Sequence, residues 1–190
     1  MKTNRLEAFS DGVLAIIITI MVLEFKVPEG DKFEDIQPLI PVFLTYLFSF
    51  IYLGIYWNNH HHLMHITQKV NGNVLWANLH LLFWLSILPF ATGWMGENHF
   101  GKHPVAFYGF VLMMNAIAWK ILTYFIIKNE GENSKLKQVY QNDTKGNFSV
   151  IIYLIGLILS FFYPKISLVL YAIVAIMWFI PDRRIEKTVH

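Results

Sequence analysis

The sequence predicts an all-α integral membrane protein with six transmembrane helices and with both termini in the cytoplasm. Three observations lead to this fold class: 55% of the 190 residues are hydrophobic, only 15% are charged, and the hydrophobic residues gather in long blocks between short polar stretches. Soluble domains average about 45–50% apolar and about 25% charged residues. The uneven distribution favours a membrane domain over an apolar soluble core.

The six predicted helices follow from the lengths of the apolar blocks. A helix that crosses a hydrocarbon core about 30 Å thick needs roughly 20 mostly apolar residues. The first block carries Asp11 near its start and ends without a small-residue cleavage site, so we predict a permanent helix rather than a signal peptide. The second block can extend past the membrane surface through residues 60–65, and Pro164 separates the last two blocks as a hairpin. The predicted helices, which form one membrane domain over residues 1–190, span about 7–27, 38–58, 74–95, 104–127, 147–163 and 165–181.

The positions of Lys and Arg predict the orientation, because cytoplasmic loops are enriched in these residues. Six alternating helices put ten basic residues on the side of the two termini and four on the other side. An odd number of helices would separate the two basic ends, so the bias also favours six. The ten are Lys2, Arg5, Lys69, Lys128, Lys135, Lys137, Lys145, Arg183, Arg184 and Lys187; the four are Lys26, Lys32, Lys102 and Lys165.

The composition excludes several classes of function. Because the chain has no Cys, it has no disulfide framework, no thiolate metal site and no cysteine nucleophile. A net charge of +2 is too small to indicate a nucleic-acid partner. His61 and His65 have a possible metal-ligand spacing, but no HExxH pattern and no carboxylate nearby in the sequence accompany them. We interpret these histidines as an interfacial cluster, and we predict no fixed metal site, no cofactor, no soluble partner and no enzymatic activity.

Two charged residues lie near the start of the first predicted helix. Intramembrane charge is costly, so Arg5 and Asp11 need partners or a wet cavity. Six residues correspond to about 120° around a helix, so these two side chains do not face each other. We expect each to contact another helix or another subunit. The alternative is that both lie at the interface and extend into water.

The apolar residues of the first helix also follow helical spacing. Ile16, Ile20 and Leu23 share one face, and Thr19 adjoins it. Taken alone, this pattern is typical of any helix that faces lipid or a protein core.

The first helix resembles that of a known family. The residues Arg5, Phe9, Ser10 and Asp11, followed by Gly-Val-x-Ala-Ile-x-x-Thr-x-x-x-Leu, resemble the signature of the transmembrane protein 175 family of potassium channels, in particular its short bacterial members. Further along, Tyr-Trp-x-x-His-His, Leu-Trp-x-Asn-Leu and Leu-Pro-Phe resemble the second and third helices of that family. The resemblance covers about the first half of the chain, and the second half agrees in length and hydropathy.

The resemblance implies a homotetramer in which four copies of the first helix line a central pore. Ile16 would form the narrowest apolar ring, Thr19 a ring of hydroxyls, and Ile20 and Leu23 would continue the lining. Arg5, Phe9, Ser10 and Asp11 would hold the first helix against its neighbours. This sequence departs from some relatives in having Ile rather than Leu at position 16. The candidate partners of Asp11 are His60, His61, His62, Trp76 and Asn78.

The predicted ion pathway differs from that of carbonyl-filter potassium channels. There is no Thr-Val-Gly-Tyr-Gly run to supply backbone oxygens. An isoleucine ring can gate by excluding water, and the hydroxyls of Thr19 can partly compensate a dehydrating ion. We therefore predict a potassium-permeable cation channel with a modest preference for K⁺ over Na⁺, with K⁺ passing close to Ile16 and Thr19.

Two other classes of membrane protein are open alternatives. A secondary transporter of a small ion or solute would show inverted repeats and helices broken at mid-membrane; Pro89 is close to such a break, yet the second half has no matching one. A membrane enzyme or haem protein would use the histidines, but paired axial ligands on separate helices are hard to find. The predicted location is the bacterial inner membrane, as a multi-pass protein in contact with the lipid bilayer.

Overall fold

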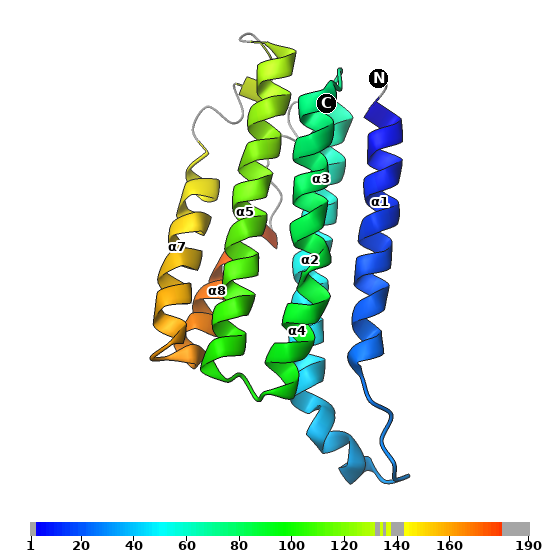
Figure 1. Ribbon diagram of the computed structural model, residues 1–190, viewed down its shortest axis with the longest axis vertical. Helices are drawn as coiled ribbons and strands as arrows, with labels where there is room; N and C mark the ends of the chain where they lie inside the picture. The colour runs from blue at the N-terminus through cyan, green and yellow to red at the C-terminus, as the bar shows by residue number, and fades with distance from the viewer. Residues whose placement is uncertain (1–2, 132–133, 135, 138–142, 180–190) are drawn as a thin grey trace.

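The computed structural model describes residues 3–131, 134, 136–137 and 143–179. Within these residues the secondary structure is entirely helical, and the helices stand side by side along one long axis (Figure 1). Six helical segments make up the bundle if α3 and α4 are counted as one. The predicted all-α membrane fold with six helices is confirmed. The helices are α1 (Thr3–Ile20), α2 (Ile40–Ile66), α3 (Gly72–Ser86), α4 (Leu88–Glu97), α5 (Lys102–Glu130), α7 (Thr144–Ser160) and α8 (Pro164–Phe179), with 3₁₀ turns η1 (Met21–Glu24) and η2 (Phe33–Leu39).

Four of the six segments are long and apolar enough to cross a membrane. They are Thr3–Glu24, Phe33–Ile66, Gly72–Glu97 and Lys102–Glu130, and α7 and α8 are shorter apolar helices. At about 1.5 Å of rise per residue, the 29 residues of α5 exceed the hydrocarbon thickness. The 17 residues of α7 come close to it. The bundle therefore has long and short helices side by side.

Several helix ends differ from the predicted ends, for identifiable reasons. The first helix begins at Thr3 and closes in the 3₁₀ turn η1, because the polar residues 3–5 are compatible with a helix and Leu6 is buried against the bundle. The second helix continues to Ile66, as the histidine stretch allowed. The third predicted helix is interrupted at Ile87, since Pro89 cannot donate to the carbonyl of Leu85. At this interruption the amide of Ile87 bonds to the carbonyls of Trp84 and Leu85.

The helices are arranged around α5. This helix packs against α3 and α4 on one side and against α7 and α8 on the other. In Figure 1, α1 lies at one edge of the bundle and α7 at the opposite edge. Helix α1 contacts α2, α3 and α4. The first helix is thus a peripheral element of the single chain.

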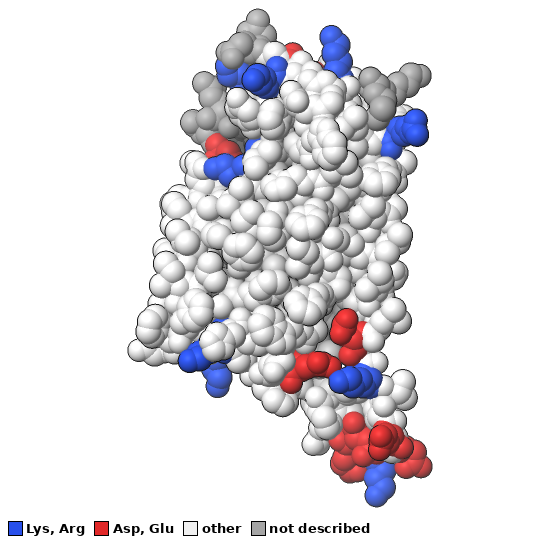
Figure 2. All heavy atoms as spheres, in the orientation of Figure 1, with Lys and Arg blue, Asp and Glu red and all other residues white. Residues whose placement is uncertain are grey.

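Charged side chains gather at the two ends of the bundle. Figure 2 shows an uncharged central band between a charged end near the N-terminus and a second charged end near residues 25–39. The second end is acidic below α1, where Glu29, Asp31, Glu34 and Asp35 lie. The uncharged band is what a helical membrane protein requires, because a charge in the hydrocarbon is costly.

Candidate functional site

Helix α1 has two distinct faces. Its buried residues are Leu6, Ser10, Leu14 and Ile17, followed by Met21 in η1, so they recur every three to four positions. The opposite face is exposed in the single chain. Ile16 is 58% exposed and Leu23 is 76% exposed. The exposed stripe consists of Arg5, Ala8, Phe9, Gly12, Ala15, Ile16, Thr19, Ile20 and Leu23. The residues predicted to line a pore therefore lie together on this stripe.

The hydroxyl of Thr19 has a fixed orientation. Its Oγ1 donates to the carbonyl oxygens of Ala15 at 2.9 Å and Ile16 at 3.0 Å. A hydroxyl has one proton and two acceptor lone pairs. Because the proton points into the helix, the oxygen presents only acceptor capacity to the exposed face. Thr19 is therefore a cation-compatible group among the apolar residues Ile16, Ile20 and Leu23.

The buried face of α1 is held by a chain of hydrogen bonds across three helices. The Nδ2 of Asn78 on α3 donates to Ser10 Oγ at 2.9 Å, and Ser10 Oγ donates to the carbonyl of Leu6 at 2.9 Å. The Oδ1 of Asn78 lies 2.8 Å from His60 Nε2 on α2. Since the amide of Asn78 is used as a donor, its oxygen accepts and His60 Nε2 carries the proton. All three side chains are at most 1% exposed, so the chain fixes the rotation of α1.

Asp11 bonds to a residue that the sequence did not single out as its partner. Trp57 Nε1 donates to Asp11 Oδ1 at 3.0 Å. Trp57 lies three and four residues before His60 and His61, so it shares their face of α2 one turn deeper in the membrane. The indole N–H can only donate, which suits a carboxylate. The position of Trp57 one turn before the histidines, on the same face, is the sequence feature that could have indicated it as a partner of Asp11.

The five expected partners of Asp11 make other contacts. His60 and Asn78 bond to each other. His61 Nδ1 lies 2.8 Å from Glu7 Oε1, and the ring of His62 packs against that of His61. Trp76 is 74% exposed. Within the chain, antiparallel α1 and α2 match in depth at Asp11 and Trp57, while the histidines lie level with residues nearer the N-terminus.

The contact between Glu7 and His61 was not predicted, because no carboxylate lies near the histidines in the sequence. When His61 is protonated, the contact is an ion pair. The His61 ring is stacked between those of Trp57 and His65, with centroid distances of 6.4 and 6.3 Å. Glu7 and Asp11 are one turn apart on α1, so two acids of α1 contact one face of α2.

Arg5 and Phe9 belong to the exposed stripe and not to the anchored face. Phe9 is 52% exposed. Among the residues that the structure describes, no hydrogen bond or ion pair partner of Arg5 is found. Of the four signature residues, Ser10 and Asp11 therefore hold α1 within its own chain, while Arg5 and Phe9 face outward.

A groove runs beside the exposed stripe, between α1 and the beginning of α4. The interruption at Ile87 places Pro89 and Phe90 at its wall, and Phe90 is 62% exposed. The groove is predominantly apolar, with Glu24 and Ser86 as its polar members. Its lining residues are Val13, Ile16, Ile17, Ile20, Glu24, Ser86, Pro89 and Phe90.

Comparisons with known proteins agree with this architecture. The family model described as endosomal/lysosomal potassium channel TMEM175 matches residues 5–89. A potassium channel of Chryseobacterium sp. (strain P1-3) is 61% identical over 188 residues, which cover 99% of this chain and 98% of the relative. A potassium channel of Streptomyces collinus is 30% identical over 135 residues, covering 67% of this chain and 66% of the relative.

A solved structure shows the same fold. The crystal structure of a lysosomal potassium-selective channel TMEM175 homolog from Chamaesiphon minutus superposes with a TM-score of 0.80 at 26% identity. The match covers 95% of this chain and 97% of the other. The bacterial relatives also agree with the predicted multi-pass location in the bacterial inner membrane. The chain belongs to the TMEM175 family, a family of ion channels and not of enzymes.

Proposed function

We propose that this chain is one subunit of a potassium-permeable cation channel in which four copies of α1 line a central pore. The observation that carries the proposal is the two-faced α1. One face is fixed to α3 by the buried hydrogen bond from Asn78 to Ser10, and Asn78 in turn bonds to His60 of α2. The other presents a continuous exposed stripe that ends at Leu23. Two bacterial relatives, from Chryseobacterium and Streptomyces collinus, are named potassium channels, which supports the same activity.

One chain offers a single such stripe, and one helix cannot enclose a pore. A closed ring of identical chains solves this problem, because each copy contributes the same face to the axis. The groove beside α1, with the exposed ring of Phe90, offers apolar surface for a neighbouring copy. Arg5, which faces outward, is then available for a contact between subunits.

The stripe has the chemistry of an apolar constriction next to a ring of acceptors. Four Ile16 side chains would form the narrowest point, and such a ring controls conduction by excluding water. The next turn carries Thr19, whose hydroxyl oxygen has its lone pairs free of the helix. Four such oxygens can replace part of the hydration shell of K⁺. The expected selectivity for K⁺ over Na⁺ is modest, because no backbone carbonyls take part.

The lysine and arginine bias orients the proposed pore. Ten basic residues on the side of the termini, against four on the other, favour cytoplasmic termini. The apolar constriction would then lie between a cytoplasmic entrance at residues 3–11 and an outer mouth at Leu23, next to the acidic residues of the 25–39 segment.

Planar-bilayer recording of the purified protein in opposed K⁺ and Na⁺ gradients tests this function. We expect ohmic single-channel currents with a reversal potential shifted towards that of K⁺, and a tetrameric mass in mild detergent. Saturable flux without unitary currents would indicate a secondary transporter instead. A protein that is only monomeric or dimeric would rule out the proposed pore.

A further inference from the structure

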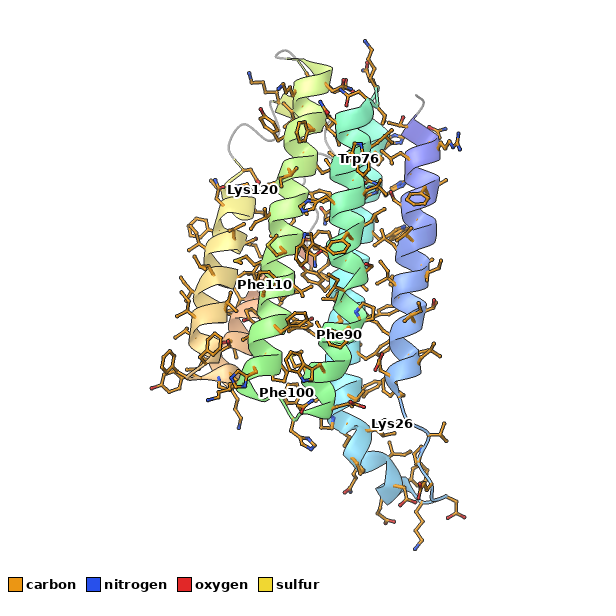
Figure 3. All side chains as sticks on the ribbon, viewed as in Figure 1. Lys26, Trp76, Phe90, Phe100, Phe110 and Lys120 are labelled. Carbon is orange, nitrogen blue, oxygen red and sulfur yellow. The ribbon has the colours of Figure 1, made fainter. Side chains whose placement is uncertain are left out.

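A row of donor side chains lies on α5, on the side of the bundle away from α1. Lys120, Tyr124 and Lys128 are spaced i, i+4 and i+8, so they share one face of the helix. Tyr124 is 58% exposed, and Lys128 Nζ lies 6.0 Å from the centre of its ring. Figure 3 places Lys120 beside the start of α7. We call these three residues, together with Asn147 of α7, the α5 basic row.

The positive charge of this row is not compensated by the described residues. Lys120 Nζ donates to Oδ1 of Asn147, which is a neutral partner. The ion pairs found among the described residues join other groups, Lys26 with Glu97 and His61 with Glu7. Because Lys120 and Lys128 have no carboxylate partner among the described residues, their charge is available to an anionic ligand.

Among the described residues, an acid next to the start of α7 and another at the end of α5 are bonded to backbone amides. Asp143 caps α7, where its Oδ1 accepts from the amide of Gly146 at 2.9 Å. Glu130, at the end of α5, accepts from the backbone amides of Gln68 and Lys69 at 2.7 and 2.9 Å. Both carboxylates are thus engaged by backbone groups.

The row lies at the depth of lipid headgroups. Helix α7 begins at Thr144, next to the level of Lys120, while α5 continues for ten residues beyond Lys120 to Glu130. With its 17 residues α7 spans about 25 Å, slightly less than the hydrocarbon core. The first turn of α7 and Lys120 therefore lie where the hydrocarbon meets the headgroups.

We propose that the α5 basic row binds the phosphate of an anionic phospholipid. The ammonium groups of Lys120 and Lys128 supply charge-assisted donors. Because Asn147 Oδ1 accepts from Lys120, its Nδ2 remains free to donate outward. The hydroxyl of Tyr124 is a further donor. Basic pockets between transmembrane helices are known to hold such headgroups.

The surface next to the row distinguishes a lipid from a free phosphate ion. Ile151 and Ile155 lie four and eight residues after Asn147, on the same face of α7, and both are exposed. They extend the surface from the headgroup level into the hydrocarbon. An acyl chain can lie along them while its phosphate contacts the lysines. A free phosphate ion would gain nothing from this apolar continuation.

Native mass spectrometry of the full-length protein, titrated with phosphatidylglycerol in mild detergent, tests the proposal. The double variant Lys120→Gln/Lys128→Gln should bind the lipid roughly tenfold more weakly than the wild type. The matched control is Lys102→Gln/Lys165→Gln, which removes the same charge at the opposite end of α5 and of the α7–α8 hairpin. The control should retain wild-type binding. Equal losses in both variants would mean nonspecific attraction and would overturn the proposal.

Two further arms identify the ligand. Phosphatidylcholine, with its zwitterionic headgroup, should bind more weakly than phosphatidylglycerol and should not respond to the double variant. Excess inorganic phosphate should not displace the lipid; displacement would assign the row to a free anion and overturn the lipid site. The same spectra report the oligomer of every variant. Lys120→Arg, which keeps the positive charge, should retain wild-type binding, and a loss as large as that of the double variant would contradict recognition by charge. Because no current is measured, failure here leaves the proposed channel untouched.

Discussion

The two edge helices of the bundle, α1 and α7, both expose apolar residues, yet they differ in composition and in how they are held. The exposed row of α7 consists mostly of large apolar residues: Phe148, Ile151, Leu154, Ile155 and Ile158. The stripe of α1 also includes small and polar positions, Ala8, Gly12, Ala15 and Thr19. Exposure alone therefore does not separate a pore-facing helix from a lipid-facing one. We propose that the composition of the exposed face does.

The buried faces sharpen the same contrast. Helix α1 is anchored by buried hydrogen bonds through Ser10 and Asn78. Helix α7 is held by close packing, since Tyr171 of α8 lies directly over Gly109 of α5 and Gly156 of α7. It also forms hydrogen bonds to its neighbours, from Trp178 to Ser149 and from Lys120 to Asn147. A polar anchor fixes the rotation of a helix, which a pore lining requires.

The largest expected effect is the loss of the polar anchor. Asn78→Leu keeps the approximate size but leaves the buried N–H of His60 without an acceptor and removes the donor to Ser10. We expect a loss of about 2–4 kcal/mol of stability, measured by thermal denaturation in detergent. Asn73→Leu, the same change at an exposed position of α3, should stay within about 0.5 kcal/mol. Similar losses in both variants would show that the hydrogen bonds do not anchor α1.

The close packing of the other edge should give the next largest effect. In Gly109→Ala the new Cβ overlaps the Tyr171 hydroxyl, and overpacking of this kind costs about 1–3 kcal/mol. No partner of that hydroxyl is found among the described residues, so Tyr171→Phe should recover part of the loss in the double variant. Gly54→Ala, where a Cβ meets nothing within 4 Å, is the control. Additive losses in the double variant would contradict the packing account.

A smaller effect is expected in the ion pathway at Thr19. Thr19→Val keeps the shape but removes the acceptor oxygen, so the K⁺ over Na⁺ permeability ratio should fall by roughly 2- to 10-fold with little gain in conductance. Reversal potentials under bi-ionic conditions measure the ratio. Thr144→Val, an exposed threonine at the start of α7, should leave it unchanged. An unaltered ratio in Thr19→Val would remove this residue from the pathway.

The smallest effect concerns Lys26, in the segment that follows η1. Lys26 Nζ lies 2.7 Å from Glu97 Oε1, and the hydrogen bond and charge of Glu97 raise the pKa of Lys26 above its usual value. A raised folded-state pKa stabilises the protein below the unfolded value of about 10.5, and this contribution disappears as the pH rises through the folded value. Denaturation midpoints should therefore fall slightly more above pH 10.5 in the wild type than in Lys26→Gln. Parallel pH profiles would show that the pair contributes nothing.

The sequence was sufficient for the family, the six helices and the shared face of Ile16, Thr19, Ile20 and Leu23, but not for the place of Arg5 and Phe9 on the same stripe. The lengths of the apolar blocks determine the number of helices, and the helical spacing of residues that share a face can be recognised in the sequence. The partner of Asp11 was not predictable in this way, because the depth at which α1 and α2 meet depends on side-chain packing. The contact of Glu7 with His61 was missed for the same reason, since the two residues are 54 positions apart.

The second half of the chain was the least predictable region. Its resemblance to known proteins was limited to length and hydropathy. The sequence around Gly109 or Gly156 does not indicate that the ring of Tyr171 packs against these glycines. The interruption at Ile87 was indicated by Pro89, yet its consequence, a groove beside α1, depends on three helices at once.

The most direct test of the account is a pair of identical substitutions at the two edges. Ile16 on α1 is 58% exposed and Ile158 on α7 is 56% exposed, so Ile16→Asn and Ile158→Asn make the same chemical change at equally exposed positions. Because an amide wets an apolar constriction, single-channel recording of Ile16→Asn should show a higher conductance and a lower K⁺ over Na⁺ ratio than the wild type. Ile158→Asn should show neither change. An unchanged Ile16→Asn channel, or an equal response in Ile158→Asn, would contradict a pore lined by α1.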